Sequence, residues 1–319
     1  MSREKQFQAI PLIEIFFKTI PFFALIGLGY WAGRTRFFNE EATAYLTKFV
    51  FYFALSALIF RFSSNLSLSE IWNANLVAGY LLATSVLYLV VLAVARARKQ
   101  DLATAAVEAQ CATMGNVGFL GIPMLTLLLG SAAIGPIVMA VSIDLAVFSS
   151  LIVILITASR EGHVNLATFR MVGVGLLKNP MVMAIVAGLL WSALQLPIPT
   201  PVSEFLDLLA AAATPGALFA IGASLASKSA ERLQIATWLS FCKLLLHPAL
   251  VAIALLILFP VDDYTAAVVI SAAALPVAGN VYILAQHYGV APHRASAAIF
   301  ISTVFSIVTV SVIIAYVST

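Results

Sequence analysis

Ten stretches of mainly apolar residues follow one another along this chain, and each is about as long as the 20 residues that a helix needs to cross a bilayer. Hydrophobic residues make up 62% of the sequence and charged residues 10%, whereas soluble domains average about 45–50% and about 25%. Because so few polar residues cannot cover a water-exposed surface, lipid must be the outer solvent. We predict an all-α membrane protein whose ten transmembrane helices span approximately residues 10–33, 41–62, 75–97, 101–129, 132–159, 179–197, 202–227, 233–259, 264–288 and 295–317.

Lysine and arginine residues lie mostly in the loops that follow the odd-numbered stretches. Only Arg3, Lys5 and Arg61 lie on the opposite side. Because basic loops stay in the cytoplasm, we predict a multi-pass protein of the inner (plasma) membrane with both termini on the outer, periplasmic side. The residues that carry this bias are Arg34, Arg36, Arg96, Arg98, Lys99, Arg160, Arg170, Lys178, Lys228, Arg232 and Arg294.

The two halves of the chain resemble each other. The tripeptide Gly-Asn-Val stands at 115–117 in the fourth stretch and again at 279–281 in the ninth. A unit of five spans crosses the membrane an odd number of times, so its second copy is inverted, as in many secondary transporters. We predict a first five-helix repeat over residues 1–160, a connecting segment over 161–178 with an interfacial helix, and a second five-helix repeat over 179–319.

Glycine and proline interrupt the fourth and the ninth stretch at corresponding depth. The fourth carries Gly115, Gly118 and Pro123, and the ninth carries Pro276 and Gly279. Inside a helix, glycine costs about 1 kcal/mol and proline about 3 kcal/mol relative to alanine. We therefore predict that both helices are broken at mid-membrane, which is typical of transporter binding sites.

A broken helix can bind an anion without an arginine, because half-helix N-termini carry partial positive charge and free N–H donors. Asn116 and Asn280 stand beside the two breaks, and each adds an amide that donates and accepts. The alternative is that these glycines, prolines and asparagines only pack and link helices; the matched pair of interruptions favours a site. The candidate substrate-binding residues are Gly115, Asn116, Val117, Gly118, Pro123, Pro276, Gly279 and Asn280.

Three motifs resemble the auxin efflux carrier family, which includes the plant PIN exporters and bacterial permeases. They are GNVGFLGIP at 115–123, LPVAGN at 275–280 followed by VYILAQHYG, and PGALFAIGASL at 215–225. The resemblance covers nearly the whole chain. It implies, as does similarity to the bile acid sodium symporters, two inverted five-helix repeats whose spans four and nine cross at their breaks, with substrate at the crossover. The central loop is shorter than in the plant branch, which favours a bacterial-type permease.

Four ionisable residues inside the predicted spans are candidates for ion coupling, because such groups are costly in a membrane. Asp144 and Lys243 lie at compatible depths in spans five and eight, and His247 follows Lys243 by one turn. Glu108 precedes the break in span four and is predicted to face the cavity from the cytoplasmic side. A buried carboxylate near a lysine or histidine can take up and release a proton. We predict H⁺ as the coupling ion; the alternative for each residue is a structural ion pair.

No cofactor or metal is predicted. Cys111 and Cys242 lie far apart in apolar stretches, which suits packing rather than a disulfide or a metal site. Glu14 and Lys18 stand one turn apart in the first span and are expected to neutralise each other.

The favoured function is secondary active transport of a small organic anion, a carboxylate or dicarboxylate that is auxin-like or malate/malonate-like. A passive anion channel is the main alternative, because broken helices also build pores, and a non-transporting membrane sensor is another. Protease and metal-site motifs are missing from the sequence, which argues against an enzyme. A net charge of +3 gives no reason to expect nucleic-acid binding. The predicted partners are the anion, H⁺ and membrane lipid, and a homodimer is left open.

Overall fold

The structure is a computed structural model that describes residues 12–65, 72–161, 166–226 and 233–317. Within these ranges the chain is helical apart from its connections, and its only extended pairing is one isolated backbone bridge. Several long helices contain a wider π-helical turn. The first half holds α1 (Leu12–Arg34), α2 (Glu40–Phe49), η1 (Val50–Ala54), α3 (Leu55–Ser63), α5 (Ala74–Ala97), α6 (Leu102–Thr113), η2 (Val117–Gly121), α7 (Ile122–Leu129), η3 (Ser131–Ala133), α8 (Ile134–Ile143), η4 (Asp144–Phe148) and α9 (Ser149–Glu161).

The linking segment and the second half are also helical. They hold α10 (Leu166–Leu177), α11 (Pro180–Ala193), α12 (Thr200–Leu225), α13 (Leu233–Phe241), η5 (Cys242–Leu246), α14 (His247–Ile253), η6 (Ala254–Leu258), α15 (Asp263–Ala273), α16 (Gly279–His287) and α17 (Pro292–Val317). Each predicted span coincides with one helix or with a run of consecutive helices.

Six helical stretches of the described chain are long and apolar enough to cross a membrane, and the bent pair α10–α11 makes a seventh if it is one span. The two broken stretches do not add to this number because their pieces are short: 117–129 and α15 are apolar helices of 10–17 residues. The prediction of an all-helical, multi-pass membrane protein is confirmed. The number of ten spans stays a prediction.

Polar caps decide where several helices begin. The side chains of Asn39, Asn73, Asp101, Asn179 and Asp262 each accept a hydrogen bond from a backbone N–H two or three residues ahead. Such a bond satisfies one of the free donors of a first helical turn. The bonds from Thr104 also hold the pKa of the Asp101 carboxyl below its usual value. The capping residues therefore mark the points where short polar loops end and apolar helices begin.

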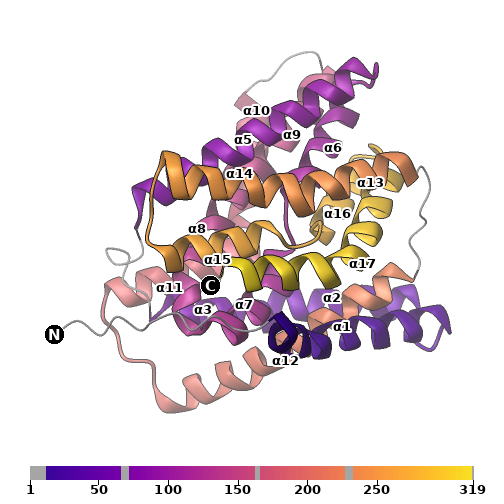
Figure 1. The fold of residues 1–319 in the computed structure, drawn as a ribbon. Helices are drawn as coiled ribbons and strands as arrows, with labels where there is room; N and C mark the ends of the chain where they lie inside the picture. Colours follow the sequence, from indigo (N-terminus) through magenta and orange to yellow (C-terminus); the bar gives the residue numbers. More distant parts are fainter. Residues whose placement is uncertain (1–11, 66–71, 162–165, 227–232, 318–319) are drawn as a thin grey trace.

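The helices pack as two groups that mix the two halves of the sequence (Figure 1). One group, called the scaffold group here, consists of α1, α2 to α3, α11 and α12; α1 lies along α12, and α11 lies along α3. Glycines bring α1 and α12 into backbone contact: a Cβ at Gly222 would lie 1.9 Å from Ile26 O, and one at Gly29 would lie 2.1 Å from Phe219 O. The other group, the core group, contains α5 to α9 and α13 to α17.

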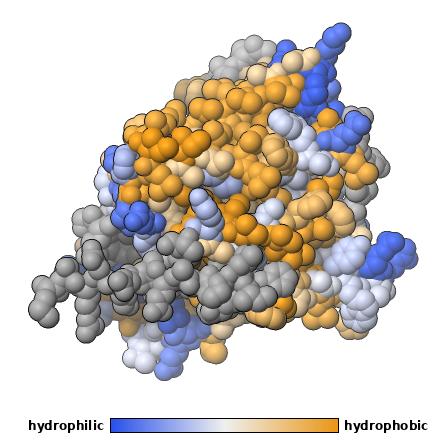
Figure 2. All heavy atoms as spheres, viewed as in Figure 1, coloured by the Kyte–Doolittle hydropathy of each residue, from blue (hydrophilic) through white to orange (hydrophobic). Residues whose placement is uncertain are grey.

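The outer surface is largely apolar. The face in Figure 2 is covered mainly by hydrophobic residues, and hydrophilic residues gather near its edges. Side chains such as Leu89, Ile257 and Phe305 are 60–69% exposed, an arrangement that suits lipid and not water.

The linking segment forms the predicted short helix. α10 exposes Leu166, Phe169 and Leu177 and is bent by 67° from α11. Some sequence predictions lie outside the described residues: the side chains of Glu14 and Lys18, and the loop residues Arg3, Lys5, Lys228 and Arg232.

Candidate functional site

The fourth predicted span is interrupted after α6. Helix α6 ends at Thr113, Met114 adopts an extended conformation, and Asn116 stands before the π-helical turn η2. Asn116 O is the first carbonyl that accepts a helical bond in this segment, and its donors are Leu120 N and Gly121 N. The N–H groups of Gly118 and Phe119 therefore have no carbonyl within the helix to bond to. A new helix N-terminus therefore begins inside the protein.

The ninth predicted span is interrupted between α15 and α16, and the two interruptions meet. Gly115 and Val277 form an antiparallel bridge. Asn116 N donates to Pro276 O at 2.8 Å, and Ala278 N donates to Met114 O at 3.0 Å. The two breaks thus satisfy part of each other's backbone hydrogen bonding, which is what irregular backbone at membrane depth requires.

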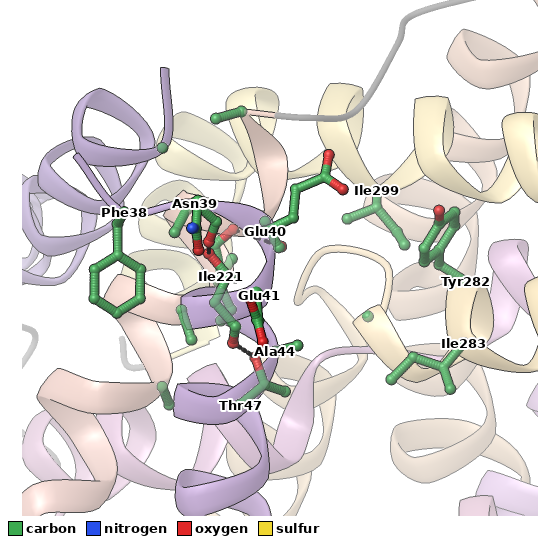
Figure 3. A pocket seen from close by; sticks show the side chains of 18 of the residues that line it. Phe38, Asn39, Glu40, Glu41, Ala44, Thr47, Ile221, Tyr282, Ile283 and Ile299 are labelled. Carbon is green, nitrogen blue, oxygen red and sulfur yellow. Dashed lines mark hydrogen bonds between the residues drawn. The ribbon is translucent and has the colours of Figure 1, made fainter. Parts of the chain in front are cut away.

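Two cavities meet at this crossover. A wide cavity of about 970 Å³ lies between the scaffold group and α16, and Figure 3 shows Phe38, Asn39 and Thr47 on one side of it and Tyr282, Ile283 and Ile299 on the other. A narrower cavity of about 440 Å³ lies beside α10. Both fall within the range of volumes typical of small-ligand pockets, about 300–1,000 Å³. The residues that line both cavities are Asn116, Phe119, Gly279 and Ile283.

Asn116 is the polar side chain at this junction. It is 7% exposed and lines both cavities. Within the described ranges its amide makes no hydrogen bond, and its amide atoms are not among the fully buried ones, so they remain open to the cavities. An unpartnered, nearly buried amide at a cavity wall is suited to binding a polar ligand.

The second helix N-terminus opens into the same space. Helix α16 begins at Gly279 without a side-chain cap, and a Cβ at Gly279 would meet no atom within 4 Å. Gly279 and Asn280 are the first residues of α16, so their N–H groups have no carbonyl within the helix to bond to. They are free to donate to a ligand. Asn280 is exposed and lines the narrow cavity, whereas Asn116 is buried. Two partially positive helix ends therefore converge on one place.

The comparison with known proteins agrees with this architecture. A family model described as Mem_trans, membrane transport protein, matches residues 14–314. The chain belongs to the Mem_trans family of membrane transport proteins. It is also similar to a protein of Rhizobium meliloti (strain 1021) named "Putative malonate transporter", with 30% identity over 306 residues that make up 94% of this chain and 95% of that protein. The resemblance to auxin efflux carriers is confirmed, and the family indicates a transporter instead of an enzyme.

In this Mem_trans protein, the other predicted substrate residues lie close to the junction or support it. Gly115, Val117 and Gly118 line the narrow cavity. Pro123 and Pro276 line neither cavity. Pro123 is buried in the first turn of α7, where a missing N–H costs little, and Pro276 contributes its carbonyl to the crossover.

Three of the four predicted ion-coupling residues occupy the core group of the Mem_trans fold near the crossover. Asp144 is 7% exposed, lines the narrow cavity and accepts a hydrogen bond from Tyr80 Oη at 3.0 Å. Lys243 and His247 are fully buried; Lys243 Nζ lies 3.0 Å from His247 Nδ1 and donates to Ala273 O. An Asp144–Lys243 ion pair, with which the depths of the two residues were compatible, is not formed: within the described residues, no contact shorter than 4.0 Å joins the two charges.

Asp144 and Lys243 both lie in π-helical turns, at the start of η4 and inside η5. Such turns loosen the helical hydrogen-bond ladder and are frequent at functional sites. The Asp144 carbonyl accepts the π-helical bond from Ser149 N and a second bond from Ser149 Oγ at 3.1 Å.

Glu108 lies elsewhere. It is fully buried and lines neither cavity. Its two carboxylate oxygens accept hydrogen bonds from Arg98 and Arg294, and Gln100 binds Arg294 at 2.7 Å. This cluster ties α6 to the loop that precedes it and to the start of α17.

Three residues of the site have no predictive signal in the sequence. Tyr80 binds Asp144, Thr84 Oγ1 lies 3.1 Å from His247 Nε2, and Ser302 Oγ accepts a bond from Val277 N at 3.0 Å. Tyrosine, threonine and serine are common in membrane helices. Only their packing against the crossover distinguishes these three.

Proposed function

We propose that this Mem_trans protein is a secondary active transporter of a small dicarboxylate of the malonate class, and that the anion binds where the two cavities meet. The observation that carries the proposal is the unpartnered amide of Asn116 beside two open helix N-termini. A carboxylate fits this place because it accepts hydrogen bonds and is attracted by the helix dipoles. The name of the Rhizobium meliloti relative supports the choice of malonate as the first substrate to test.

Alternating access is proposed as the mechanism. The wide cavity is lined by Arg34 and Arg36 and the narrow cavity by Met171 and Val172, all of which belong to connecting segments that the charge bias predicts to be cytoplasmic. The structure then represents an inward-facing state. The outward-facing state requires the core group to move against the scaffold group, carrying the crossover with it.

Inverted repeats are part of this proposal, and the pairing of helices supports them. The first span packs on α12 and the sixth, α11, packs on α3, so that spans one and six each contact the second span of the other half. Likewise α5 packs on α6, and α14 packs on α15. Equivalent contacts in both halves are expected when one five-helix unit occurs twice in opposite orientation.

We further propose that Asp144 carries the coupling proton. Its carboxylate is the acidic group that lines the narrow cavity, so it is reachable by water and substrate. The charged and titratable groups around it are Tyr80, which donates to it, and the Lys243–His247 pair behind it. Substrate and proton would then enter from one cavity.

The test is transport by purified protein in proteoliposomes. Labelled malonate should enter saturably, exchange with internal malonate, and accumulate when an inward proton gradient is imposed. Asp144→Asn should abolish gradient-driven accumulation while malonate exchange and folding persist. Unitary currents without saturation or exchange would identify a channel, and unchanged accumulation by Asp144→Asn would remove this residue from coupling.

A further inference from the structure

The two breaks of the crossover are stabilised differently at their carbonyl ends. Helix α6 ends at Thr113, and the carbonyl of the next residue, Met114, accepts a backbone bond from Ala278 N. Helix α15 ends at Ala273, and the carbonyl of Ala273 accepts its bond from the ammonium of Lys243, a residue 30 positions away on η5. A side-chain cation thus caps the second break, whereas backbone caps the first.

Lys243 reaches the centre of the crossover. A Cβ at Gly115 would lie 3.2 Å from both Cε and Nζ of Lys243 and 3.3 Å from Ala272 O. The ammonium therefore lies among the last carbonyls of α15, directly behind the residue that precedes Asn116. The C-terminal end of a helix carries partial negative charge, so a cation there is favourable.

Both neighbours of the Lys243 amino group can accept a hydrogen bond from it. An ammonium has donors only, so His247 Nδ1, at 3.0 Å, must accept from it. His247 Nε2 then carries the proton and donates to Thr84 Oγ1 at 3.1 Å. With Lys243 charged, both ring nitrogens of His247 have a partner, which suits an orienting role.

The charge of Lys243 lacks a close counter-charge. The side chain is fully buried, and no carboxylate of the described chain lies within 4.0 Å of it. A buried charge is costly unless it is paired. An anion beside Asn116 would supply the missing negative charge across the thin backbone of Gly115.

We propose that Lys243 has two roles at the crossover: its ammonium caps the carbonyl end of α15, and its positive charge favours an anion at Asn116. The side chain would thereby replace a co-transported metal cation. In transporters with broken helices, half-helix carbonyl ends are where Na⁺ commonly binds. Here that position is filled by the protein's own ammonium. Lys243 is a positioning residue, because it acts through the backbone and does not reach either cavity.

The structural part is tested by hydrogen exchange on the full-length protein in detergent. Lys243→Met keeps an unbranched chain of similar length but loses the charge and the donors, and Lys243→Gln keeps a donor without the charge. Lys243→Met should accelerate exchange over residues 274–281 about tenfold, the factor for one lost hydrogen bond, and Lys243→Gln should restore much of the protection. Lys99→Met, at an exposed loop position, is the control. Wild-type protection in Lys243→Met would overturn the proposal.

The electrostatic part rests on the proposed function and uses malonate as the probe. Malonate should raise the melting temperature of the wild type and of Lys99→Met but of neither Lys243 variant, because both lack the charge. Wild-type uptake should be unchanged when choline replaces Na⁺. If wild-type uptake requires Na⁺, that result alone overturns the proposal. If the wild type does not respond to malonate at all, the proposed substrate fails, while hydrogen exchange still tests the cap.

Discussion

In the first broken helix a buried carboxylate anchors the segment before the break, whereas in the second a buried ammonium caps it. Glu108 holds α6 through Arg98 and Arg294 and lines neither cavity, and Lys243 holds α15 at the crossover itself. The two amides differ as well: Asn116 is nearly buried and Asn280 is exposed. The two breaks share a backbone pattern, but only the first brings an unpartnered amide to the junction of the cavities.

The largest effect is expected at the anchor of the first broken helix. Glu108→Gln leaves two arginines without their shared counter-charge, and removal of one partner of a buried ion pair costs about 3–5 kcal/mol. Thermal unfolding in detergent should show a large loss of stability. The control is Asp207→Asn, which breaks an exposed pair with Arg61 and should cost at most about 1 kcal/mol. Equal losses in the two variants would contradict an anchoring role.

The asparagines should differ in substrate affinity. Asn116→Ala removes the amide at the junction, and a hydrogen bond to a charged group is worth about 1.5–3 kcal/mol, so malonate affinity should fall about 10-fold to 100-fold. Asn280→Ala, at the exposed position, should have a smaller effect. Titration of the malonate-induced thermal shift measures both. If Asn280→Ala proves the more damaging, the site lies in the narrow cavity and not at the junction.

The glycines at the two breaks offer a steric comparison. A Cβ at Gly115 would press on Lys243 and Ala272 O at 3.2–3.3 Å, whereas one at Gly279 would meet nothing within 4 Å. Gly115→Ala should therefore cost about 1–3 kcal/mol, as overpacking does, and should reduce uptake; Gly279→Ala should leave stability nearly unchanged. Melting temperature and initial uptake rate report the difference. Tolerance of Gly115→Ala would mean that Lys243 can move away from the crossover.

The smallest effect is expected on the side of the crossover that faces α17. Ser302→Ala removes the acceptor of Val277 N and leaves a buried donor unsatisfied, at a cost of about 1 kcal/mol, the low end of the usual range for such a group. The matched control is Ser306→Ala, because Ser306 bonds only to a carbonyl of its own helix. Hydrogen exchange of residues 274–281 should increase in the first variant alone. Equal exchange in both would show that Ser302 does not hold the break.

Local chemistry was sufficient to predict the broken helices and the residues beside them. Gly115, Pro276 and Gly279 disfavour regular helix whatever surrounds them, and both interruptions occur beside them, whereas Pro123 lies within the helical run 117–129 that follows the first break. Glu108 was predicted to face the cavity but lines neither cavity, and its role in coupling stays a prediction. Its two arginine partners come from loops that are distant in sequence, and a charge pattern along the chain does not show which loops meet.

What the sequence by itself determined is the class of protein, the position of its apolar helices and the two breaks, because each depends on side-chain hydropathy and backbone preference over a few neighbouring residues. Only the tertiary structure decided that the breaks pair through Gly115 and Val277, that Asn116 is buried while Asn280 is exposed, and that Lys243 caps α15 instead of pairing with Asp144. These outcomes depend on contacts between helices far apart in sequence, where packing chooses which polar groups meet.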